Sequence, residues 1–88
     1  MDLTNAIDAA VRAADKALAG EMQTLDGRPA APHLERLRRE LLDMRARGGV
    51  GADELRAMIR DVASWAPEDD VTLLGALGVV ARASGRRG

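Results

Sequence analysis

The chain has 88 residues and a formal net charge of -1, which allows one domain and gives no overall attraction to DNA or to anionic membranes. It contains no cysteine, one histidine and one aromatic residue, Trp65. Disulfide frameworks, zinc ribbons, thiol nucleophiles and base-stacking platforms are therefore excluded, and we expect neither a cofactor nor a metal.

Helix formers dominate the apolar part of the composition. Alanine and leucine are abundant, whereas the β-branched and aromatic residues typical of strands are scarce. We expect an all-α fold, a compact bundle of three to four helices. One helical domain is predicted over residues 1–84, followed by a flexible C-terminal tail over residues 85–88.

The first predicted helix begins at Asp2 or Thr4 and ends at Ala19, where Gly20 serves as a C-terminal stop. An apolar stripe suited to a helix–helix contact runs along it. The charged side chains are expected on the opposite, solvated face: Asp8, Arg12, Asp15 and Lys16.

Residues 21–31 form the longest irregular stretch. The run Asp26-Gly27-Arg28-Pro29 is typical of a turn, because glycine accepts positive φ and proline breaks a helix. We interpret the stretch as a connecting loop, with a binding loop as the alternative. Met22 and Leu25 are expected to hold it against the core.

The second predicted helix, Pro32–Arg47, has proline where its missing N–H is harmless, and it ends at Gly48-Gly49. From His33 to Arg47 it carries five arginines and three acids, a local charge of +2. His33 lies in the first turn of this helix beside Glu35 and Arg36, and we expect it at the surface. A catalytic role is not expected, because neither Ser64 nor Ser84 has a nucleophile-elbow context.

Arg38 and Arg45 are the most informative residues of this helix, because its periodicity places both among leucines. Their stems could cover the edge of the core while the guanidinium groups reach water. Alternatively, Arg38, Leu42 and Arg45 form an interface with a partner protein, since arginine is enriched at interface hot spots. Phosphate contact is a third reading. Trp65 is a further candidate for partner binding.

The third predicted helix, Ala52–Ala66, opens with two acids that oppose its dipole and has the cleanest amphipathic pattern. The fourth is predicted over Pro67–Ser84, because proline followed by three acids is a helix start signal. Residues 71–81 are apolar on nearly every side, so this helix is expected to be buried all round. A buried strand is the alternative for this run.

Gly75, Gly78 and Arg82 share one stripe of the fourth predicted helix. A glycine inside a helix costs about 1 kcal/mol relative to alanine. Two of them on one face allow close backbone approach, either by the first helix of the same chain or by a second copy. In the second case the stripe is a dimer seam.

These patterns favour a small soluble protein-interaction module, an adaptor, inhibitor or regulator whose partner is another protein or a second copy. We expect no enzyme, because no set of nucleophile, base and orienting group can be assembled. The alternative is a nucleic-acid-binding regulator that uses the arginine-rich second helix. We expect a cytoplasmic protein without a membrane segment, since Asp2 and Asp8 stand where a signal peptide needs positive charge and no apolar run reaches about 20 residues.

Overall fold

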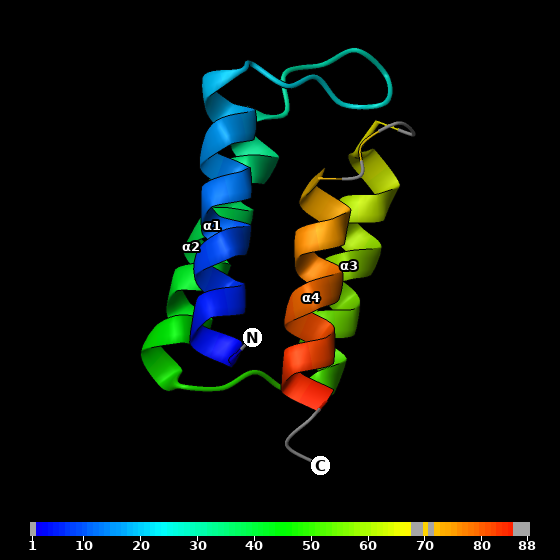
Figure 1. The fold of residues 1–88 in the computed structure, drawn as a ribbon. Coiled ribbons are helices and arrows are strands. Elements are labelled where there is room, and N and C mark those ends of the chain that lie inside the picture. Colours follow the sequence, from blue (N-terminus) through cyan, green and yellow to red (C-terminus); the bar gives the residue numbers. More distant parts are fainter. Residues whose placement is uncertain (1, 68–69, 71, 86–88) are drawn as a thin grey trace.

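The computed structural model describes residues 2–67, 70 and 72–85, and these residues form four helices (Figure 1). The all-α prediction is confirmed. The helices are α1 (Leu3–Ala19), α2 (Ala31–Arg47), α3 (Ala52–Trp65) and α4 (Thr72–Gly85).

Capping accounts for the start of α1 and the end of α2. The Asp2 carboxylate accepts a hydrogen bond from the Asn5 N–H at 2.8 Å and caps the start of α1. Gly48 ends α2 in the left-handed conformation, with φ of 75°, as expected for a glycine stop. At the end of α1, however, Gly20 has φ of -84° and the left-handed residue is Glu21, with φ of 53°.

The fourth helix begins later than predicted. Pro67 and Asp70 are not helical, and the Asp70 N–H donates to the Pro67 carbonyl at 3.0 Å, which is a turn contact. Aspartate competes with helix formation by bonding to nearby backbone, so an acidic run can form a turn as readily as a first helical turn. Helix rather than strand is confirmed for residues 72–81. The helix includes Gly85, and the rest of the predicted tail, 86–88, lies outside the described residues.

The helices form two hairpins that lie side by side (Figure 1). In the part of the chain that the structure describes, α1 packs closely against both α2 and α4, and α4 packs against α3. The helices α2 and α3 approach each other less closely. The bundle is therefore well packed along α1 and α4 and more open between α2 and α3.

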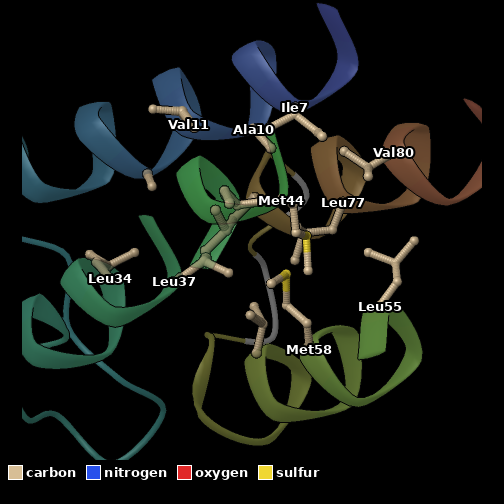
Figure 2. Close-up of a cluster of buried hydrophobic side chains, with 14 of the residues drawn as sticks. Ile7, Ala10, Val11, Leu34, Leu37, Met44, Leu55, Met58, Leu77 and Val80 are labelled. Atoms are coloured by element: carbon tan, nitrogen blue, oxygen red, sulfur yellow. The ribbon is translucent and has the colours of Figure 1, made fainter. Parts of the chain in front are cut away.

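One core joins all four helices (Figure 2). Three alanines of α1, Ala6, Ala10 and Ala14, are 0% exposed and allow the neighbouring helices to come near. Larger side chains fill the space between the hairpins, and the bulkiest of those that are fully buried are Ile7, Leu34, Leu41, Met44, Leu73, Leu77, Val62 and Val80. Small residues on α1 thus compensate for the scarcity of aromatic residues.

The loop between α1 and α2 is tied to the far hairpin. Thr24 is buried, and its backbone N–H donates to the Arg28 carbonyl at 2.7 Å. The Leu25 N–H donates to the Trp65 carbonyl at 2.8 Å, at the end of α3. Met22 packs against the core as expected, but the expectation for the Leu25 side chain is wrong, because it is 56% exposed. The backbone, not that side chain, holds the loop.

Candidate functional site

Arg38 and Arg45 form ion pairs across the α1–α2 seam. The Arg38 Nε lies 2.7 Å from an Asp15 carboxylate oxygen, and an Arg45 guanidinium nitrogen lies 2.5 Å from Asp8. Each arginine directly follows a buried apolar residue in the sequence of α2. Their guanidinium groups pair with carboxylates of α1 and do not face water alone. Asp8 and Asp15, expected on a fully solvated face, instead line this seam.

A spacing signal for these pairs was present in the sequence. Asp8 and Asp15 are seven residues apart on α1, and Arg38 and Arg45 are seven apart on α2. In an antiparallel hairpin the first acid meets the second arginine and the second acid meets the first arginine, as observed. Exposed pairs of this kind contribute only about 0.2–1 kcal/mol each.

Leu42 and Trp65, the other predicted partner-binding residues, are largely withdrawn from the surface. Leu42 is half-buried and packs against the core. Trp65 is only 6% exposed, at the end of α3. The structure brings Arg38 and Arg45 to one seam of α2, while Trp65 lies at another, between α2 and α3.

Trp65 belongs to a small polar and aromatic cluster, the His33–Trp65 cluster, made of His33, Arg36, Asp61 and Trp65. The His33 and Trp65 rings stack with centroids 4.9 Å apart and planes inclined by 15°. One carboxylate oxygen of Asp61 accepts from the indole N–H at 3.3 Å and from Arg36 at 3.0 Å. His33 is therefore half-buried in a helix contact, a role that its position in the sequence did not indicate.

A groove of about 430 Å³ lies between α2 and α3. From α2 it is lined by Arg36, Glu40, Asp43 and Arg47. From α3 it is lined by Glu54, Ala57, Met58 and Asp61. Both sets have the spacing of one helix face, so two complete helix faces meet across the opening. We call this feature the α2–α3 groove.

Two ion pairs span the α2–α3 groove. Arg36 pairs with Asp61 at 3.0 Å and Arg47 pairs with Glu54 at 2.5 Å. A hydrogen bond from Arg47 to Glu54, and the charge of Glu54, raise the pKa of Arg47 above its ordinary value. Because that pKa is raised, the part of the stabilisation that depends on the Arg47 charge is present at neutral pH and is lost as the pH rises into strong alkali. The groove is thus bounded by charged bridges that form in the folded chain.

Gly75 and Gly78 do not serve close packing within the chain. A Cβ atom added at either position would meet nothing within 4 Å. Gly75 is exposed and Gly78 half-buried, so one side of α4 faces outward. The expectation that α4 is buried all round is wrong, because α1 and α3 cover only part of its surface. Arg82 is exposed near the end of the same helix.

A second hollow, of about 460 Å³, lies where α1 ends and the following loop folds back over α2. Leu18, Met22 and Leu34 line it, with Glu21 and Gln23 beside them. It carries no ion pair between described residues that would organise a ligand. The interpretation of residues 21–31 as a binding loop remains a prediction.

Within the described residues, no group of three or more histidine, aspartate and glutamate side chains is placed to hold a metal ion. None of the described helices combines the length and apolar character needed to cross a membrane. Comparison of the chain with protein-family models, with curated proteins and with solved structures gives no match.

Proposed function

We propose that the chain is a non-catalytic protein-interaction module, an adaptor, inhibitor or regulator, that binds its partner at the α2–α3 groove. The observation that carries this proposal is the groove itself, about 430 Å³ between two helices that are both well anchored in the core. Grooves between helices are common docking sites for a segment of another protein.

The face with Arg38 and Arg45 supports docking less well than the groove does. Each guanidinium group already has a carboxylate partner on α1. A binding protein would have to match or displace those pairs, with little net gain from exposed charges. Arg38, Leu42 and Arg45 remain candidates for the margin of an interface rather than for its centre.

The pairing of arginines also counts against nucleic-acid binding. Four arginines of α2 are matched with carboxylates of the same chain: Arg36, Arg38, Arg45 and Arg47. Phosphate binding releases counterions only where basic side chains are available to neutralise it. Protein rather than nucleic acid is therefore the better-supported partner.

A second candidate is self-association through the outer face of α4. Gly75 and Gly78 leave open space there, and Arg82 is the only charged residue of this helix in the sequence. Helices with little outward charge are well suited to a symmetric interface between two copies. Light scattering of the intact chain at high micromolar concentration tests for such a dimer.

A photo-crosslinking amino acid at position 57 tests the main proposal. Ala57 lines the groove, whereas Ala63 is an exposed alanine of the same helix that does not line it. In cells that produce the full chain, we expect a discrete cross-linked partner from position 57 and not from position 63. The same products from both positions, or none from position 57, would contradict docking at the groove.

A further inference from the structure

Resting on the proposed function, we infer that the partner segment is an amphipathic helix with lysine or arginine beside an apolar anchor residue. The α2–α3 groove places carboxylates above an apolar floor, and this juxtaposition selects that class of ligand. The net charge of the groove, its apolar floor and its length each favour a helix of this kind.

The charge of the groove favours a cation. Its lining carries four carboxylates and two guanidinium groups. The guanidinium groups of Arg36 and Arg47 are matched by Asp61 and Glu54. Glu40 has no ion-pair partner among the described residues, and Asp43 shares Arg47 at 3.1 Å. The groove therefore has an excess of negative charge near its middle, which attracts a basic side chain and repels an acidic one.

The floor of the groove favours an apolar anchor beside that cation. Met58 is only 5% exposed and forms part of the core, while Ala57 next to it is exposed. Methionine is flexible and polarizable, so it adapts to different apolar side chains. An aliphatic side chain entering between the bridges would contact Met58 and cover Ala57.

The dimensions of the groove fit a short helix. From Arg36 to Arg47 α2 advances about 16 Å, at about 1.5 Å per residue. That length matches about three turns of a partner helix, whose side chains at i, i+3, i+4 and i+7 face one way. Because two ion pairs span the groove, such a helix lies over the opening and inserts side chains between the bridges.

Two synthetic peptides test the inference on the intact chain. One is an amphipathic helix of lysine, leucine and alanine, and the other has glutamate in place of every lysine. Trp65 is the only tryptophan and hydrogen-bonds to Asp61 in the groove lining, so its fluorescence reports binding. Amide chemical shifts in NMR spectra locate the contact. We expect only the lysine peptide to bind, with shifts centred on Ala57 and Met58.

A matched pair of charge-reversal variants separates the groove from general attraction. Glu40→Lys with Asp43→Lys changes the groove, and Asp26→Lys with Glu35→Lys makes the same charge change at exposed residues outside it. Two lost charge contacts should weaken binding of the lysine peptide about tenfold or more in the groove variant, with far less change in the control. Glu40→Gln with Asp43→Asn, checked by circular dichroism, shows the same direction of effect if reversal disturbs folding.

Three results overturn the inference: equal binding of the two peptides, equal loss in the two reversal variants, or shifts confined to another face. A self-association that the groove variant abolishes would also overturn it, since the occupant would then be a second copy. A discrete cross-link from position 57 without binding of the lysine peptide rejects only the basic helix. Peptide binding without that cross-link rejects the proposed function instead.

Discussion

The α1–α2 seam and the α2–α3 seam are both crossed by two arginine–carboxylate pairs, yet only the first is closely packed. Alanines of α1 that are 0% exposed lie in the interior beside α2 and α4. Across α2–α3 the pairs instead span a groove of about 430 Å³. Exposed pairs contribute about 0.2–1 kcal/mol each, which is too little to draw together two helices that are otherwise less closely packed. Small buried side chains therefore go with close contact on one side of α2, and charged side chains bound the open groove on the other.

A substitution at Trp65, in the α2–α3 seam, should have the largest effect on stability. Trp65→Ala removes a buried ring, its stack on His33 and its hydrogen bond to Asp61. We expect a loss of about 3–5 kcal/mol in the free energy of unfolding. Urea unfolding followed by circular dichroism measures it, because the fluorescent residue is gone. Trp65→Phe, which keeps a buried ring, is the control and should lose clearly less.

Replacing an alanine by leucine on α1 and in the α2–α3 groove compares how tightly the two places are packed. Ala10→Leu adds bulk to a position that is 0% exposed on α1, and we expect it to destabilise the fold by about 1–3 kcal/mol. Ala57→Leu adds the same bulk in the open groove and should leave stability nearly unchanged. Thermal midpoints of the two variants give the answer. Similar losses for both would mean that the groove is as tightly packed as the α1 seam.

The outer face of α4 extends the comparison to a third surface. Gly75→Ala and Gly78→Ala add Cβ atoms that meet nothing within 4 Å, so each should stabilise the helix by about 1 kcal/mol. Light scattering at high micromolar concentration shows whether the parent chain exceeds its monomer mass of 9.3 kDa. If it is a dimer through this face, the added methyl groups should weaken association while raising the stability of each copy. A dimer that tolerates both changes does not use this stripe.

The smallest expected effect concerns the ion pairs themselves. A double-mutant cycle with Asp8→Asn and Arg45→Gln should give a coupling of about 0.5–1 kcal/mol, at the upper end for exposed pairs, because the Asp8 side chain is only 32% exposed. The cycle for Glu54 and Arg47, across the groove, should give a smaller coupling. Both should shrink as salt is added. A larger coupling across the groove would reverse the ranking of the two seams.

Local signals made most of the helices predictable. The start of α1 follows from an aspartate cap, the start of α2 from a proline in its first turn and the end of α2 from a glycine stop, each acting within a few residues. The start of α4 was not predictable in this way, because an acidic run after Pro67 is compatible with a turn and with a helix. Propensity alone does not separate these two outcomes.

The surfaces were only partly predictable, because they depend on which helices are neighbours. The periodicity of α2 places Arg38 and Arg45 among leucines of the same helix, but naming their ion-pair partners requires knowing that α1 lies antiparallel to α2. The α2–α3 groove has no signature in the sequence, since it reflects how far apart two helices stand after others have packed. The His33–Trp65 stack was missed for the same reason.

The hydrogen bond from the Leu25 N–H to the Trp65 carbonyl joins a loop of the first hairpin to the end of the second. Leu25 lies in the loop between α1 and α2, and its side chain is exposed. Amide protons of exposed loops ordinarily exchange quickly with water. This one can exchange only when the bond between the hairpins opens. Its exchange rate in deuterated water therefore reports how often this single contact between the hairpins opens, and a ligand that holds the contact closed would slow the exchange of that proton.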